Sequence, residues 1–325
     1  MISRVADHLF WLGRYLERAE SAARVGLVTR NLALDGELDP RSAWQPAVIV
    51  SGEEEAFRAR HGDDAFADGE KVQHWLTWEE TNLSSLRRTV AAARDNARSI
   101  REVLSLETWE AVNELFLWME GAGRATYRED RHGFYRNIRQ ASQLSLGVIH
   151  GTMLHDDAFD FILLGVMLER AGQTSRILDV HHHALANLLQ AHQAVEVSLW
   201  LALLRACSGF EPFMKRFQGE PSAATVARFL VLDARFPRSV NHCLHVAGKK
   251  LSRVRSADAD LRGHSLTRLR ALESWVVDEA RPHIDGGRLH DLLTRVVDET
   301  HGICDELGRE LFGYPAAEAE GAAGQ

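Results

Sequence analysis

The sequence predicts an all-α protein, a helical bundle built from two tandem, related repeats. Apolar residues recur at the three- and four-residue spacing of helices along most of the chain. No convincing run of alternating valine, isoleucine and threonine, which is typical of strands, occurs in the sequence. The chain also has no proline between Pro46 and Pro212. Because an interior proline costs a helix about 3 kcal/mol, this spacing permits long uninterrupted helices.

The repeats are visible in two segments that carry the same residues in the same order. Segment 9–28 reads LFWLGRYLERAESAARVGLV and segment 161–180 reads FILLGVMLERAGQTSRILDV, so Glu169 follows Glu17 by 152 residues. Further pairs occur in the same order: Trp44 and Trp200, Ser51-Gly52 and Ser208-Gly209, Phe57 and Phe213, Arg60 and Arg216, Leu76 and Leu230, and Ser85 and Ser239. An ordered series of this kind indicates a duplicated unit.

The duplication predicts how the chain is divided. Residues 1–150 are the first helical repeat, which includes an acidic loop at 35–69, and residues 151–313 are the second. Residues 314–325 are small and polar, so we expect them to form a disordered tail. The two repeats are expected to pack as one compact unit.

Helices of the first repeat are expected at 3–35, 70–78, 83–104, 108–119 and 134–150. Ser3 can cap the first helix, and Gly121 and Gly123 end the helix that begins at 108. Glycine, proline and acidic residues accumulate from 35 to 69. We therefore expect loop there, with one short helix from about Trp44.

The second repeat is expected to begin with a long central helix. Asp156 or Asp157 can cap this helix, which runs past His183 towards Gln190. Its segment 161–180 is apolar on nearly every face, which predicts a helix buried all round. A helix at 288–312 closes the fold. Prolines are expected at the ends of short helices between these two: Pro212, Pro221, Pro237 and Pro282.

The composition argues against several classes of protein. A net charge of −8 and a pI near 6.1 argue against nucleic-acid binding, which needs clustered lysine and arginine to neutralise phosphates. Every stretch of about 18 residues carries a charge, so no membrane span is expected. Three widely spaced cysteines predict neither a disulfide framework nor a zinc site. These cysteines and a start unlike a signal peptide favour a cytoplasmic location.

The candidate site consists of charges within the two matching segments: Glu17, Arg18 and Arg24, and Glu169, Arg170 and Arg176. Burying an unpaired charge costs several kcal/mol, so these residues are expected to form a hydrogen-bonded network. Neighbours on a helix point about 100° apart, so each glutamate needs a partner from another turn or another helix. Two interpretations remain open. The network fixes how the two repeats dock, or it forms a pocket that binds a ligand carboxylate or amine.

Other motifs predict neither a metal nor a cofactor. His181 to His183 fan over about 200° of a helix and cannot bind one metal together. Asp298 and His301 resemble half of a di-iron carboxylate motif, but the second half is missing. The phosphate-binding motifs G-x-x-x-x-G-K-[ST] and G-x-G-x-x-G do not occur, so nucleotide binding by this chain has no support in the sequence.

Four ordered motifs resemble the alpha-E family, bacterial helical proteins named for a Glu-Arg motif. They are SRVADHLFWLGRYLERAE, AAARDNARSIRE followed by ETWEAVNEL, LGVMLERAGQTSRILDV, and FLVLDARFPRSV. One departure is Leu83, where the resemblance leads us to expect proline. Members are encoded beside, or fused to, circularly permuted ATP-grasp ligases, often near transglutaminase-like proteins. The resemblance therefore implies a role in making or processing a peptide or amide bond.

The function that this resemblance implies is that of a cytoplasmic, non-catalytic helical partner. It would bind an ATP-grasp peptide or amide ligase, or that ligase's peptide or amino-acid substrate. Two alternatives remain open. One is an amide-forming or amide-cleaving enzyme that uses Glu17 and Glu169 as acid and base, while the arginines of both motifs hold a carboxylate. The other is a purely structural scaffold. An open cavity beside the Glu-Arg pairs would favour ligand binding, and enclosure within helix contacts would favour a structural role.

Overall fold

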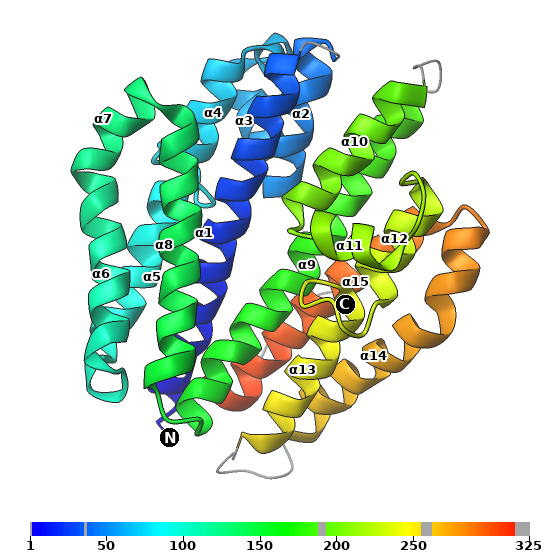
Figure 1. Cartoon of the computed structure of the whole chain (residues 1–325). Helices are drawn as coiled ribbons and strands as arrows, with labels where there is room; N and C mark the ends of the chain where they lie inside the picture. The colour runs from blue at the N-terminus through cyan, green and yellow to red at the C-terminus, as the bar shows by residue number, and fades with distance from the viewer. Residues whose placement is uncertain (1, 36–37, 188–192, 255–261, 316–325) are drawn as a thin grey trace, which may run out of the picture.

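The computed structural model describes residues 2–35, 38–187, 193–254 and 262–315. The described residues form helices and no strand, so the predicted all-α class is confirmed (Figure 1). The far end of the expected central helix, near Gln190, and most of the expected tail, from residue 316 onwards, lie outside the described residues.

The described residues up to 152 form eight α-helices and two short 3-10 helices. In order they are α1 (Ser3–Asp35), α2 (Pro40–Ser51), α3 (Glu54–His61), η1 (Asp63–Ala67), α4 (Gly69–Thr77), α5 (Leu86–Ser99), η2 (Arg101–Val103), α6 (Leu106–Glu120), α7 (Ala122–Glu129) and α8 (Arg131–Thr152). The bounds of α1 are those expected from the sequence.

The described residues after 156 form α9 (Asp157–Asn187), α10 (Gln193–Ala206), α11 (Phe210–Arg216), α12 (Ala223–Leu232), α13 (Val240–Arg253), α14 (Arg262–Asp285), α15 (Leu289–Leu307) and the π-helical turn η3 (Gly308–Phe312). Asp156 caps the start of α9 as expected, because its Oδ1 accepts hydrogen bonds from the backbone N–H groups of Ala158 and Phe159.

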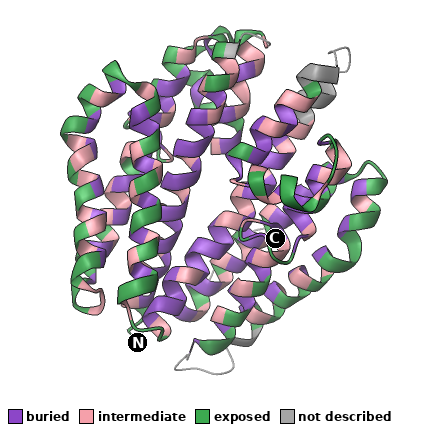
Figure 2. Cartoon of the chain, in the orientation of Figure 1, coloured by how far each residue is buried: buried purple, intermediate pink, exposed green. Residues whose placement is uncertain are grey.

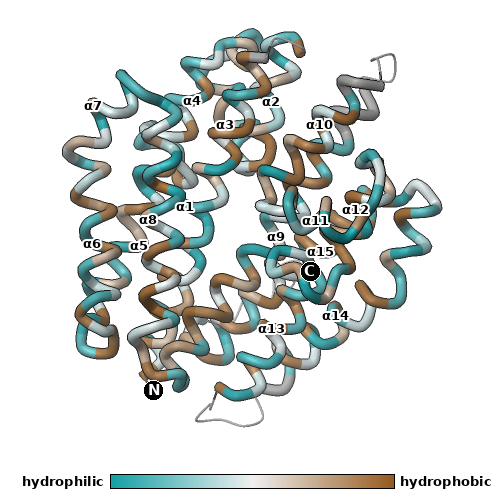
Figure 3. The backbone as a smooth tube through the Cα atoms, viewed as in Figure 1, coloured by the Kyte–Doolittle hydropathy of each residue, from teal (hydrophilic) through white to brown (hydrophobic). Residues whose placement is uncertain are grey.

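The centre of the molecule is formed by α1 and α9, which pack directly against each other. On its other sides α1 contacts α5 and α8, and α9 contacts α13 and α15 (Figure 1). Figure 2 shows both central helices largely buried, and Figure 3 shows the apolar first turns of α9. Burial around segment 161–180 agrees with the sequence prediction.

Two glycines allow the backbones of α1 and α9 to meet. A Cβ atom on Gly13 would lie 2.1 Å from the carbonyl oxygen of Ile162, and one on Gly165 would lie 2.1 Å from that of Phe10. Real side chains do not approach a backbone oxygen so closely, so this crossing requires glycine at both positions. The close approach brings the charges one turn later into reach of the facing helix.

The expected acidic loop at 35–69 is largely helical, which corrects the sequence prediction. Two of the acidic residues cap helices: Asp39 accepts from the backbone of Arg41 and Ser42 at 3.1 Å, and Asp68 caps α4 in the same way. Phe57 packs against Phe66 and Trp75, with ring centroids 4.9 and 5.6 Å apart. This small aromatic core stabilises helices too short to be recognised by their periodicity.

Three further expectations need correction. A separate helix, α7, follows Gly121 where only a helix end was expected, and its Tyr127 packs on Trp78. Pro282 lies inside the last turn of α14 and not at the end of a short helix. Tyr314 is not part of a disordered tail, because its hydroxyl donates to Asp7 at 2.6 Å. No helix of the described residues combines the length and apolar character needed to cross a membrane.

Candidate functional site

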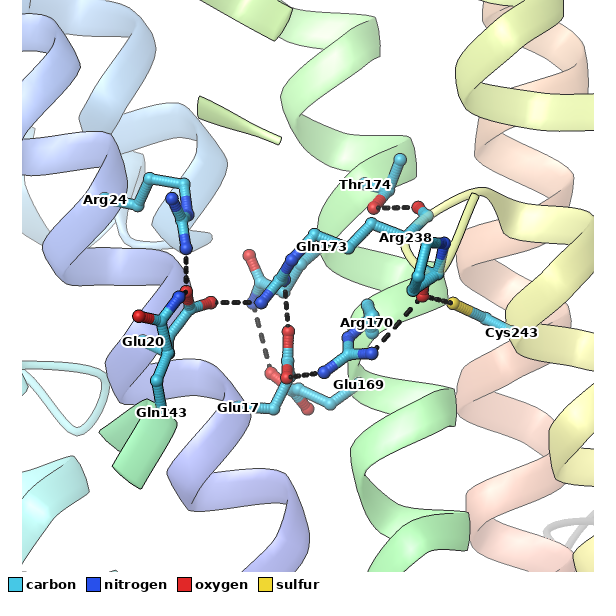
Figure 4. Close-up of polar contacts among 11 residues, drawn as sticks. Glu17, Glu20, Arg24, Gln143, Glu169, Arg170, Gln173, Thr174, Arg238 and Cys243 are labelled. Atoms are coloured by element: carbon cyan, nitrogen blue, oxygen red, sulfur yellow. Dashed lines mark hydrogen bonds and ion pairs between the residues drawn. The ribbon is translucent and has the colours of Figure 1, made fainter. Parts of the chain in front are cut away.

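The two Glu-Arg motifs pair with each other across the contact between α1 and α9. Arg170 Nη2 donates to Glu17 Oε2 at 2.7 Å, and Arg18 Nε donates to Glu169 Oε1 at 2.7 Å. Each glutamate thus pairs with the arginine of the other motif, because adjacent residues on one helix do not face each other. Figure 4 shows Glu17, Glu169 and Arg170 between the two central helices.

The side of the network around Glu17 is completed by Arg238, from the loop before α13. Arg238 Nη1 donates to Glu17 Oε1 at 2.5 Å, and its Nη2 donates to Glu20 Oε2 at 2.5 Å. Glu20 also accepts from Arg24 and from Gln143 Nε2, the latter at 3.0 Å (Figure 4). Both glutamates are 0% exposed, so their charges are neutralised entirely by protein groups.

Local hydrogen bonds hold the loop that carries Arg238. Thr174 on α9 donates from Oγ1 to the Arg238 carbonyl at 2.9 Å, and Arg170 Nη1 donates to the Pro237 carbonyl at 3.3 Å. Ser239 then caps α13 by accepting from the backbone N–H of His242. The loop is therefore fixed to the same helix face as the Glu-Arg motif.

The side around Glu169 has different partners. Arg14 Nε donates to Glu169 Oε2 at 2.9 Å, and Arg18 Nη2 donates to the same oxygen at 3.0 Å. Gln173 Nε2 donates to Oε1 at 3.1 Å. The Glu169 carboxylate is almost fully buried, but it lines a cavity of about 180 Å³. That volume is well above what one water molecule needs.

The cavity wall carries an excess of positive charge. Arg14, Arg18 and Arg176 line the cavity together with the single carboxylate of Glu169. Apolar side chains from α1, α2, α4 and α5 also line it: Val25, Trp44, Val50, Leu76 and Leu86. The cavity therefore suits a molecule with an anionic group beside an apolar group.

Arg176 and His301 contact each other in the wall of the cavity. Arg176 Nη2 lies 2.9 Å from His301 Nε2, and because a guanidinium only donates, the imidazole accepts through this nitrogen and is neutral. Burial lowers the pKa of His301, and Arg176 and Arg14 lower it further. Burial also lowers the pKa of Arg176, with Arg18 and Arg14 adding to the effect.

Both motif glutamates remain ionised. Burial alone would raise the pKa of Glu169, but Arg18 and Arg14 outweigh it and hold the pKa well below its usual range. For Glu17, burial is outweighed in the same way by Arg170 and Arg238, so its pKa is lowered. A glutamate with a depressed pKa is a poor general acid or base at neutral pH.

The six candidate residues divide between two environments. Arg18, Glu169 and Arg176 line the cavity, whereas Glu17, Arg24 and Arg170 are not among its lining residues. Four further titratable residues that contact this network were not among the candidates: Arg14, Glu20, Arg238 and His301. Glu20 and Arg14 lie one turn from Glu17, so helix spacing could have found them. Arg238 lies within the motif FLVLDARFPRSV, but nothing in that motif relates it to Glu17. No group of metal-ligating side chains occurs among the described residues.

Comparison with known proteins bears on the identity of this network. A family model described as a predicted alpha-helical domain with a conserved ER motif matches residues 1–312. The chain is 26% identical to uncharacterized proteins of Mycobacterium bovis and Mycobacterium tuberculosis, an alignment that covers 97% of this chain and 35% of each relative. The chain thus spans about a third of the length of these curated relatives. No solved structure matches it significantly. The match to residues 1–312 includes both Glu-Arg motifs and the helices that carry them. The chain therefore belongs to the Alpha-E family.

Proposed function

We propose that this chain is a non-catalytic helical partner of a circularly permuted ATP-grasp peptide or amide ligase, and that it binds the ligase's peptide or amino-acid substrate. The observation that carries the proposal is the cavity beside Glu169, which is lined by both cationic and apolar side chains. Amino acids and peptide termini have this combination of carboxylate and side chain. The sequence lacks a phosphate-binding motif, so the ATP chemistry is assigned to the ligase.

The proposed architecture consists of two related repeats, 1–150 and 151–313, in a cytoplasmic protein. The order of helix contacts supports the duplication, since α1 packs on α5 and α8 as α9 packs on α13 and α15. The reciprocal contacts of Gly13 and Gly165 support it as well. So do matching helix starts, because Ser85 and Ser239 stand at the N-cap positions of α5 and α13, although only Ser239 accepts a hydrogen bond from the helix backbone.

The length of the relatives supports a role beside other domains. The curated mycobacterial relatives match this chain over only 35% of their length, so in them the helical region shares a polypeptide with other segments. A unit that works next to a separate catalytic domain fits this arrangement.

The enzymatic alternative has weaker support. It requires Glu17 and Glu169 to act as acid and base on one substrate, but Glu17 is enclosed by Arg170 and Arg238 and does not line the cavity of Glu169. The depressed pKa of each glutamate also argues against proton transfer at neutral pH. A purely structural scaffold would account for Glu17 but not for the cavity.

The proposal is tested by assaying phosphate release from ATP with a panel of amino acids and dipeptides. The cognate ligase is measured alone, the chain alone, and both together. The chain alone should show no turnover, and its addition should raise or redirect turnover by the ligase. Turnover by the isolated chain, or an unchanged ligase in its presence, would contradict the proposal.

A further inference from the structure

Arg24 and Arg176 occupy matching positions but have different partners. They lie 152 residues apart, and Arg24 pairs with the fully buried carboxylate of Glu20. The residue 152 positions after Glu20 is Gly172, which lines the cavity. Among the described residues no carboxylate pairs with Arg176, whose Nη2 instead contacts His301. A carboxylate that is present on the first side is therefore absent on the second.

A second side chain also has a smaller counterpart on the cavity side. Arg238 immediately precedes the cap of α13, and Ser84 immediately precedes Ser85, the N-cap residue of α5. Arg238 occupies the space between Glu17 and Glu20, whereas Ser84 lines the cavity. The cavity thus lies where a carboxylate and a long side chain stand in the other half.

We propose that this cavity binds the carboxylate of an amino acid or of a peptide C-terminus, and that the carboxylate contacts Arg176 as Glu20 contacts Arg24. The assignment rests on the proposed function, because it takes the bound molecule to be an amino acid or a peptide. It also rests on the proposed duplication, because it compares the surroundings of Glu17 with those of Glu169. It adds the orientation: carboxylate at Arg176, side chain towards Trp44 and Leu76.

The charges around Arg176 favour an anion. The Glu169 carboxylate already accepts hydrogen bonds from Arg14 and Arg18, so three guanidinium groups face one carboxylate. A second carboxylate would reduce this excess and could form two parallel hydrogen bonds with a guanidinium. Space is available, because a Cβ atom on Gly172 would meet only Thr300 Oγ1, at 3.7 Å.

A further group indicates that the ligand also donates a hydrogen bond. Gln73 lines the cavity and is 5% exposed, and its Oε1 has no hydrogen-bond partner among the described residues. Its Nε2 is already used, since it donates to the Gly69 carbonyl at 3.0 Å. A buried amide oxygen normally accepts a hydrogen bond, and the N–H of a peptide or the ammonium of an amino acid supplies one.

The inference is tested by titrating the purified chain, without ligase, in a calorimeter. The probes are the dipeptide Ala-Leu, the same dipeptide with an amidated C-terminus, and free leucine. Ala-Leu should bind, and the amidated dipeptide should bind about tenfold to a hundredfold more weakly because it lacks the carboxylate. Tighter binding of Ala-Leu than of leucine identifies a peptide terminus, and the reverse identifies an amino acid. Equal binding of Ala-Leu and its amide, or no binding of either acid, would overturn the inference.

Two variants locate the carboxylate. Gly172→Glu places a carboxylate where Glu20 stands on the other side, so it should pair with Arg176 and abolish binding of Ala-Leu while the melting temperature is kept or raised. The matched control Gly172→Ala adds a side chain without charge and should weaken binding far less than Gly172→Glu does. Arg176→Gln should weaken binding at least tenfold, and it provides a second test should Gly172→Glu fail to fold. Wild-type affinity in Arg176→Gln would overturn the orientation.

This experiment separates the inference from the proposed function. Binding of Ala-Leu or leucine by the chain, without any effect on ligase turnover, would leave the cavity assignment intact and contradict the partnership. Stimulation of the ligase by a chain that binds neither probe would support the partnership and overturn the cavity assignment.

Discussion

Glu17 and Glu169 stand at matching positions on the two central helices, but their surroundings differ. Glu17 is enclosed by Arg170 and by Arg238, which also reaches Glu20. Glu169 accepts hydrogen bonds from Arg14 and Arg18 and borders a cavity. The glutamate of one motif thus lies within a closed ion network, and the glutamate of the other borders a cavity that is also lined by Arg14, Arg18 and Arg176.

The difference shows how one pattern of residues can serve two roles. The reciprocal pairs Glu17 with Arg170 and Glu169 with Arg18 connect the helices, and they are alike on both sides. Two of the neighbours that differ are Glu20 against Gly172 and Arg238 against Ser84. At these two positions large charged side chains fill the first side, and small residues leave space on the second.

The largest expected effect is that of Arg238→Ala. This change removes one partner from each of two glutamates that are 0% exposed. Glu17 keeps Arg170 and Glu20 keeps Arg24, but two buried carboxylates each lose a charged partner. Breaking a buried ion pair by removing one partner costs about 3–5 kcal/mol, so the free energy of unfolding should fall by about that amount. Urea denaturation followed by circular dichroism measures it.

The matched change on the cavity side is Arg14→Ala, for which we expect a smaller loss of about 1–3 kcal/mol. Glu169 keeps its hydrogen bonds from Arg18 and Gln173 in this variant, and the cavity admits water. Equal losses in free energy of unfolding for Arg238→Ala and Arg14→Ala would show that the closed side and the cavity side contribute equally to stability, which would contradict the difference between them.

Glycine substitutions test the feature that the two sides share, which is the close contact of α1 and α9 at Gly13 and Gly165. Gly13→Ala and Gly165→Ala each place a Cβ atom against a facing backbone carbonyl, so each should destabilise the protein by about 1–3 kcal/mol or more. Gly172→Ala, on the same helix as Gly165, meets only Thr300 Oγ1 and should stabilise by up to about 1 kcal/mol. Thermal melts of the three variants decide this. A strong loss in only one of the first two would break the proposed symmetry.

Acidification should weaken both sides. The pKa values of Glu17 and Glu169 are lowered in the folded protein, so their contribution is fully present above the unfolded-state value of about 4.3. It is lost as the pH falls below that value, by up to about 1.4 kcal/mol per pH unit for each group. Denaturation curves between pH 6 and about 3 measure this slope. Glu17→Gln and Glu169→Gln should each reduce it, and a variant with the wild-type slope would show that its glutamate is not held ionised by the network.

The sequence predicts the central part of this molecule better than its edges. Long periodic segments specify α1 and α9, and helix geometry requires that Glu17 and Glu169 find partners outside their own motifs. The helices between 40 and 67 depend on caps and on packing around Phe57, which a pattern of acidic residues does not indicate. Arg238 lies 221 residues from Glu17, and only the folded chain reveals that it fills this side and that Ser84 does not fill the other.

The smallest expected effect, and the one that most sharply separates the two sides, comes from removing the matching arginines Arg24 and Arg176. Arg24→Gln removes a partner of the fully buried Glu20 and should cost about 1–3 kcal/mol. Arg176→Gln breaks no pair with a carboxylate of the described residues, and the attraction to Glu169 that it loses is offset by relief from repulsion by Arg18 and Arg14, so stability should change by less than about 0.5 kcal/mol. Urea denaturation at neutral pH compares the two. A residue that adds little to stability, and that carries a partly buried charge beside a cavity, is expected to be retained for binding. A loss for Arg176→Gln as large as that for Arg24→Gln would instead assign Arg176 to the structural network.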